Sequence, residues 1–119
     1  MRLLKSFAFA INGLRLCCKE PNFRIHLLVA LLAVGVGFWL KISAQEWVLV
    51  LLCIGLVLSL EMLNTALEQL CNLLHPGQHP VIKAVKDISA AAVLLVAIMS
   101  VCCGTIIFLP KLLLILQNP

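Results

Sequence analysis

The chain has few charged residues, and this scarcity excludes most soluble folds. Only 12% of its 119 residues are charged, with nine basic and five acidic side chains, while 63% are hydrophobic. Its mean hydropathy of +1.14 is far above that of an average soluble domain. A water-soluble domain of this size could not hide so much apolar surface. The sequence therefore predicts an all-α integral membrane protein with one domain over residues 1–119.

Several familiar motifs are also missing. Neither G-x-x-x-x-G-K-[ST] nor G-x-G-x-x-G occurs, so nucleotide binding cannot be argued from a soluble phosphate-binding loop. Residues 1–19 have four basic residues, no uninterrupted apolar core and no small-residue cleavage site, so we expect no cleaved signal peptide. The six cysteines form no C-x-x-C pair, which favours reduced thiols packed as small hydrophobic groups. No nucleic-acid partner is expected.

Three apolar stretches are candidates for membrane spans, at residues 23–41, 47–67 and 88–109. A helical span needs about 20 residues, and the second stretch reaches that length only by including Glu61 and Asn64. Glu61 is therefore expected within the apolar depth, with Glu68 about 10 Å further along the helix, near the interface.

Residues 1–20 have a different pattern, with basic and polar side chains on one broad face and apolar side chains on the other. This pattern is typical of an amphipathic helix that lies in the membrane interface. Seven of the nine basic residues precede or open the first span or lie between the second and third. The N-terminus and the second loop are therefore predicted to be cytoplasmic.

Two carboxylates and an amide follow a long uncharged run at the end of the second span. Glu61, Asn64 and Glu68 are spaced i, i+3 and i+7, so they share one face of a helix. A carboxylate inside a span is costly unless it faces protein or water, and this favours a functional site. The alternative is a polar contact between helices that serves only assembly, with Glu68 solvated at the interface.

Other charges are expected at the same membrane face. Glu20 precedes the first span, and Lys86 and Asp87 open the third. Carboxylates with an amide and a lysine suit a hard cation bound together with a phosphate. Taken alone, however, Lys86 and Asp87 equally fit an ordinary charged helix start, and Glu20 fits a solvated turn.

Two segments are distinctive, EMLNTALE at residues 61–68 and KDISAAAVL at residues 86–94. Together they closely resemble the prokaryotic diacylglycerol kinase and undecaprenol kinase family. The resemblance covers nearly the whole chain. It implies a homotrimer of three-span subunits, each with an N-terminal surface helix, and active sites shared between neighbouring protomers. It further implies the bacterial inner membrane, a cytoplasmic active site, ATP as co-substrate and Mg²⁺ as cofactor.

The resemblance also implies a role for individual residues. Glu61 would be the general base that takes the proton from the lipid hydroxyl. Glu20 and Glu68 would hold the metal that bridges the nucleotide phosphates. The residues expected to bind nucleotide phosphates or orient their contacts are Asn64, Lys86 and Asp87. Asn72 stands where the family commonly has an aspartate on the nucleotide side, so an altered nucleotide contact is expected there.

The lipid substrate follows from weaker features of the resemblance. Residues 22–26 and 42–47 look more like the undecaprenol kinase branch, which favours conversion of undecaprenol to undecaprenyl phosphate. A diacylglycerol kinase that makes phosphatidic acid is the alternative. A non-catalytic membrane protein, with buried acids for ion passage or assembly, is a further alternative. Conduction would need acids along the whole membrane depth, whereas the acid within the spans lies towards one side, and the third span has none beyond Asp87.

Overall fold

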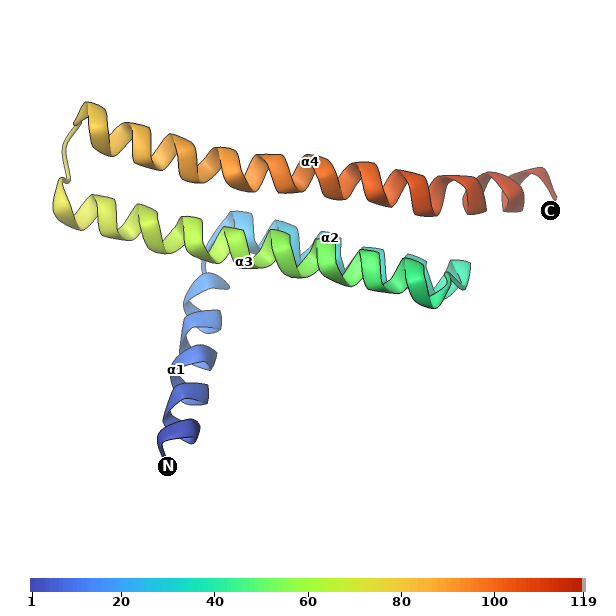
Figure 1. Cartoon of the computed structure of the whole chain (residues 1–119), viewed down its shortest axis with the longest axis horizontal. Helices are drawn as coiled ribbons and strands as arrows, with labels where there is room; N and C mark the ends of the chain where they lie inside the picture. Colours follow the sequence, from blue (N-terminus) through green and yellow to red (C-terminus); the bar gives the residue numbers. More distant parts are fainter. Residues whose placement is uncertain (119) are drawn as a thin grey trace.

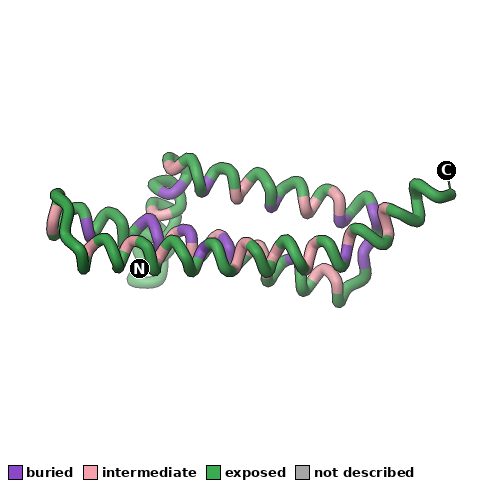
Figure 2. The backbone as a smooth tube through the Cα atoms, turned by 90° about the horizontal axis from the view of Figure 1, so that it is seen from above, coloured by how far each residue is buried: buried purple, intermediate pink, exposed green. Residues whose placement is uncertain are grey.

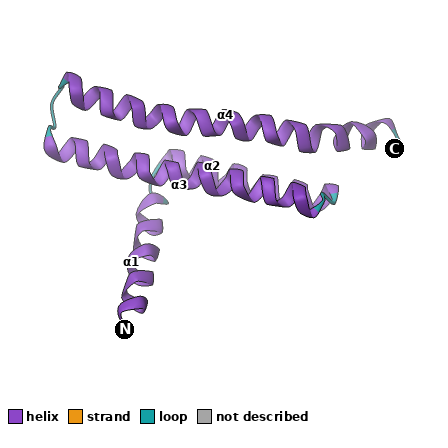
Figure 3. Cartoon of the chain, in the orientation of Figure 1, coloured by secondary structure: helices purple, strands orange, loops and turns teal. Residues whose placement is uncertain are grey.

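Four helices make up nearly all of the computed structural model, which describes residues 1–118 (Figure 1). They are α1 (Arg2–Cys17), α2 (Pro21–Leu40), α3 (Ala44–Leu74) and α4 (Pro80–Gln117). No strand occurs within the described residues (Figure 3). Helices α2, α3 and α4 are each long and apolar enough to cross a membrane. The predicted all-α class, with three spans and an N-terminal helix, is confirmed.

The three long helices run side by side, and α1 projects away across their common axis (Figure 1). Helix α3 packs most extensively against α4 and also contacts α2. Only three residues, 18–20, separate α1 from α2, and Pro21 opens α2 with Glu20 as its N-cap. Proline suits the first turn of a helix, where its missing N–H leaves no hydrogen bond unmade. Glu20 is therefore the joint between the projecting helix and the first span.

Specific residues end and restart the helices. Lys41 takes a left-handed conformation (φ 51°) and closes α2. The Ser43 side chain accepts a hydrogen bond from the Glu46 N–H, and the Glu46 carboxylate accepts one from the Ser43 N–H, so α3 begins with a capping box. His79 caps α4 ahead of Pro80. The turns are short, so consecutive spans run antiparallel.

Helices α3 and α4 continue beyond the apolar stretches that predicted them. With 31 and 38 residues, they are about 46 and 57 Å long, whereas the hydrocarbon core of a bilayer is about 30 Å thick. Apolar composition marks the part of a helix that lies in lipid, but backbone hydrogen bonds carry the helix further. Glu61 lies about 26 Å along α3 from Ala44, towards the end of the span.

Buried side chains gather at the end of the bundle where α2 meets α3. The cluster consists of Leu40, Ile42, Val50 and Ile107, with Trp47 and Phe108 packed against it. Gly37 makes this packing possible, because a Cβ at this position would lie 2.8 Å from Cη2 of Trp47. Elsewhere the outer faces of the helices are largely exposed and apolar (Figure 2), as expected for surfaces that contact lipid or other protein chains.

Candidate active site

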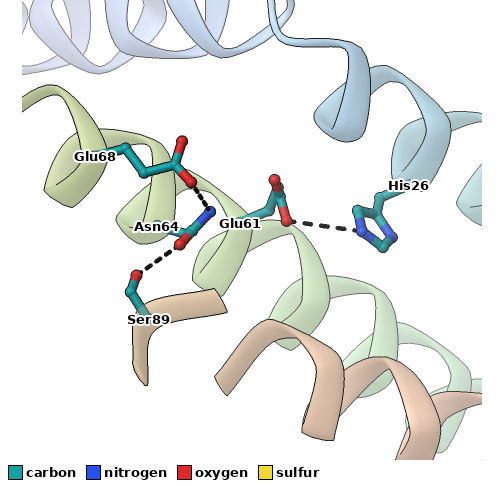
Figure 4. Close-up of polar contacts among 5 residues, drawn as sticks. All are labelled: His26, Glu61, Asn64, Glu68 and Ser89. Carbon is teal, nitrogen blue, oxygen red and sulfur yellow. Dashed lines mark hydrogen bonds and ion pairs between the residues drawn. The ribbon is translucent and has the colours of Figure 1, made fainter. Parts of the chain in front are cut away.

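Helix α3 presents its polar residues on one face, as the spacing predicted. Glu61 and Asn64 are buried, with 4% and 7% of their surface exposed, whereas Glu68 is exposed. The Asn64 Nδ2 donates a hydrogen bond to Oε1 of Glu68 at 3.4 Å (Figure 4). Over two helical turns the face therefore changes from a buried carboxylate to an accessible one.

Helix α4 contributes Ser89 to this face. Its hydroxyl donates to Oδ1 of Asn64 at 2.7 Å (Figure 4). Because the amide oxygen accepts this bond, the amide nitrogen is directed towards Glu68. Ser89 thus fixes the orientation of the Asn64 amide from a neighbouring helix.

Helix α2 contributes His26. Its Nε2 lies 3.7 Å from Oε2 of Glu61, with the two side chains 26% and 5% exposed. The distance is longer than a hydrogen bond but within the range of an ion pair when the imidazole is protonated. The three spans therefore meet at one polar centre (Figure 4).

The turn between α1 and α2 also approaches this centre. Cys17, the last residue of α1, is buried, and burial raises the pKa of its thiol. The charges of Glu20 and Glu61 act in the same direction, so both carboxylates lie close enough to influence this thiol. Glu20 itself is half-buried, and its side chain makes no cap hydrogen bond.

Lys86 and Asp87 have different partners. Lys86 Nζ donates to Oδ1 of Asn72, which lies one turn beyond Glu68 on α3. Asp87 pairs with Lys83 at 2.6 Å on the exposed surface of α4. Among the described residues, no hydrogen bond or ion pair joins Lys86 or Asp87 to Glu68. Lys86 therefore contacts α3 through Asn72, whereas Asp87 pairs with Lys83 of its own helix.

Sequence reasoning did not identify His26 and Ser89 as site residues. Ser89 is a small residue at the start of the third span, and in the sequence alone such a residue indicates only close packing of helices. For His26 a signal did exist, because it is the one histidine within an apolar span. Which side chain meets which across a bundle depends on helix rotation, and the pattern along one helix does not specify this.

The contacts of Glu20 and Glu68 bear on whether these two carboxylates can hold a metal ion. No group of three or more His, Cys, Asp or Glu side chains suited to a metal occurs within residues 1–118. Mg²⁺ needs fewer protein ligands, because it usually binds through one or two carboxylates together with water and substrate phosphates. Glu68 is exposed and engaged only by the long bond from Asn64, and the Glu20 carboxylate makes no cap bond. Both side chains are therefore available as carboxylate ligands of the kind that such an ion uses.

Fold and site together define a class, the small multi-pass helical membrane proteins with a carboxylate centre where their spans meet. Comparison with known proteins specifies the family. The family model described as prokaryotic diacylglycerol kinase matches residues 8–108. The chain belongs to this family, and it is therefore a lipid kinase.

Individual relatives support the same assignment. The undecaprenol kinase of Bacillus subtilis is 41% identical over 112 residues, covering 93% of this chain and 91% of that protein. The diacylglycerol kinase of Synechocystis sp. is 37% identical over 113 residues, covering 93% of this chain and 65% of that protein. The diacylglycerol kinase of Escherichia coli (strain K12) is 33% identical over 101 residues, covering 84% and 83%. The resemblance stated from the two motifs is confirmed.

Proposed function

We propose that this chain transfers the γ-phosphate of ATP, in the presence of Mg²⁺, to undecaprenol, forming undecaprenyl phosphate. The observation that carries the proposal is the buried carboxylate of Glu61 near the end of the apolar part of α3, with Asn64 and Glu68 on the same face. The 41% identity to a protein named undecaprenol kinase supports this lipid. Diacylglycerol is the second candidate, because other relatives are named diacylglycerol kinase.

Glu61 is the proposed general base. It accepts the proton of the lipid hydroxyl while the lipid oxygen forms a bond to the γ-phosphorus. The bond from that phosphorus to the bridging oxygen breaks, and ADP leaves with the electron pair. Phosphoryl transfer needs positioning and charge neutralisation more than covalent help, so a small helical site suffices. A base at the edge of the apolar layer meets the hydroxyl without extracting the lipid from the membrane.

The nucleotide side is proposed to lie around Asn64 and Lys86. The Asn64 amide has a donor aimed along the face, and the Lys86 ammonium lies one turn beyond Glu68, beside Asn72. Both suit phosphate oxygens. Asp87 would orient the basic side chains of α4 through its pair with Lys83. Asn72 is a proposed nucleotide contact, and its neutral side chain would change nucleotide preference relative to an aspartate.

Glu20 and Glu68 are the proposed Mg²⁺ ligands. When bound, the ion would supply positive charge that neutralises the nucleotide phosphates. The protein's own contribution is to hold one carboxylate on α3 and the other at the joint before α2.

The assembly and location are also proposals. We infer a homotrimer in the bacterial inner membrane. Residues 1–20, which include α1, would lie on the cytoplasmic surface, and the other three helices of the single domain would span the membrane. The exposed apolar faces of the three spans support association with further copies. The predominance of basic residues before and within α2 and at the start of α4 supports the orientation.

The test is transfer of labelled phosphate from ATP to undecaprenol and to diacylglycerol in parallel mixed micelles. Glu61→Gln should remove transfer and leave the fold and oligomer intact. Glu46→Gln is the matched control, because Glu46 lies at the opposite end of α3 and pairs with Lys111 at 3.2 Å. This variant should keep transfer.

The outcomes separate the candidates. The ratio of the two lipid products decides between the two kinase branches. Loss of the oligomer in Glu61→Gln would instead favour the assembly function. Absence of transfer by the folded wild type to either lipid would refute the proposal.

A further inference from the structure

The partner of the buried Glu61 carboxylate comes from another helix. Within residues 1–118 no hydrogen bond reaches this carboxylate, and its one ion-pair contact is with Nε2 of His26 at 3.7 Å. No fully buried side-chain oxygen or nitrogen in this part of the chain is without a hydrogen-bond partner. The Glu61 oxygens are therefore not sealed off, although the residue as a whole is 4% exposed. The carboxylate is reachable, and within residues 1–118 the one ion-pair partner that another helix offers it is an imidazole.

The remaining charges near Glu61 have the same sign as its own. Glu68 lies two turns further along α3, and Glu20 lies at the joint before α2. Both carboxylates repel an ionised Glu61 and, when ionised, have no hydrogen-bond donor that could hold its side chain. His26 is the only neighbour of opposite potential charge among these groups. A carboxylate in this environment needs such a partner to hold one geometry.

His26 also stands where the polar centre meets an apolar groove. The groove has a volume of about 520 Å³ and lies between α2, α3 and α4, with Ala30, Val57 and Ala97 among its lining residues. Such a volume is within the range of small-molecule sites, about 300–1,000 Å³. His26 is the one basic residue in the lining. Its ring therefore touches both the apolar space and the carboxylate.

We infer that His26 is a positioning residue for the phosphoryl transfer, which holds the Glu61 carboxylate towards the lipid hydroxyl. The inference rests on the proposed function, since it presupposes Glu61 as the base. A small side-chain rotation brings the 3.7 Å contact to hydrogen-bond distance, with Nε2 as the donor. Held in this way, one carboxylate oxygen is occupied by the imidazole and the other is left for the substrate proton.

The test compares two substitutions of His26 that differ in polarity. Gln retains an N–H donor, whereas Leu fills similar space without one and is well suited to a span. Loss of a hydrogen bond to a charged group predicts that kcat of His26→Leu falls about 10- to 100-fold. His26→Gln should keep at least several times the kcat of His26→Leu. The KM for ATP should stay near the wild-type value in both, because the imidazole does not contact the proposed phosphate-binding residues.

His75→Gln is the matched control, because His75 lies in the turn after α3 with its Nδ1 near the Gly77 carbonyl. It should leave kcat unchanged. Coupling gives a second readout: in a Glu61→Asp background, where the carboxylate no longer reaches the imidazole, His26→Leu should cost much less than in the wild type. Circular dichroism and oligomer size verify that each variant is folded.

Several results would overturn the inference. Equal kcat for the folded Gln and Leu variants would show that His26 serves packing alone. A raised KM for ATP with kcat retained would assign it to the nucleotide. If the effects of His26→Leu and Glu61→Asp on kcat are fully additive, His26 does not act through Glu61. Absence of transfer by the wild type would refute the proposed function itself, which is a different outcome.

Discussion

The hydrogen bond from Ser89 to Asn64 joins α4 to α3 at the site, and its removal can be predicted quantitatively. Ser89→Ala deletes the donor of a 2.7 Å bond in a partly buried position and leaves the backbone unchanged. Polar contacts between membrane helices average about 0.6 kcal/mol, and a typical intramolecular hydrogen bond contributes at most about 1.5 kcal/mol. The free energy of unfolding should therefore fall by about 0.6–1.5 kcal/mol.

The same bond orients the amide that we assign to the phosphates. Without it the Asn64 amide can turn its nitrogen away from Glu68. If the bond energy is used fully in the transition state, kcat/KM for ATP should fall about 3- to 10-fold. The assay is steady-state transfer at varied ATP and saturating lipid, beside denaturant unfolding in micelles.

Ser100→Ala is the matched control. Ser100 lies on the same helix, is half-buried, and makes no side-chain hydrogen bond within the described residues. Its removal should change stability by less than about 0.5 kcal/mol and leave kcat/KM unchanged. Equal kinetics for the two variants would refute the orienting role of Ser89. If Ser89→Ala lowers the stability without changing the kinetics, the bond serves only the packing of the two helices.

Two further predictions concern packing and thiol reactivity. Gly37→Ala should destabilise the protein by about 1–3 kcal/mol, because the new Cβ would lie 2.8 Å from Trp47. Gly35→Ala, with no atom within 4 Å of its Cβ, should not do so in the same thermal-unfolding measurement; equal losses would contradict this reasoning. Maleimide should label the exposed Cys18 rapidly and the buried Cys17 slowly. Because the pKa of Cys17 is raised, its labelling should accelerate only at higher pH, and equal rates followed by mass spectrometry would count against its burial.

Much of the fold could be predicted from the sequence because a membrane span has a strong compositional signal. Glu61, Asn64 and Glu68 could be placed on one face because their spacing matches the helical period. The ends of α3 and α4 were less predictable, since the helices continue past the apolar segments until the turn at residues 75–79.

The cross-helix partners could not be predicted. His26 and Ser89 reach the centre because of the rotation and register of α2 and α4, which depend on packing of all three spans. The pairing of Lys86 with Asn72 has the same origin. All the assigned roles in catalysis and in binding metal, phosphates or nucleotide stay predictions, namely those of Glu20, Glu61, Asn64, Glu68, Asn72, Lys86 and Asp87.

The capping box at the start of α3 and Glu61 towards its other end belong to one continuous helix, which fixes the distance between them. It sets the carboxylate about 26 Å from the opposite end of the span. Bilayers differ in thickness by several ångströms around about 30 Å. In a thin bilayer Glu61 would lie among the headgroups and water. In a thick bilayer it would lie deeper in the hydrocarbon than the lipid hydroxyls. If Glu61 is the base, the rate of phosphate transfer should therefore depend on the thickness of the membrane, with an optimum set by the number of residues between Ser43 and Glu61.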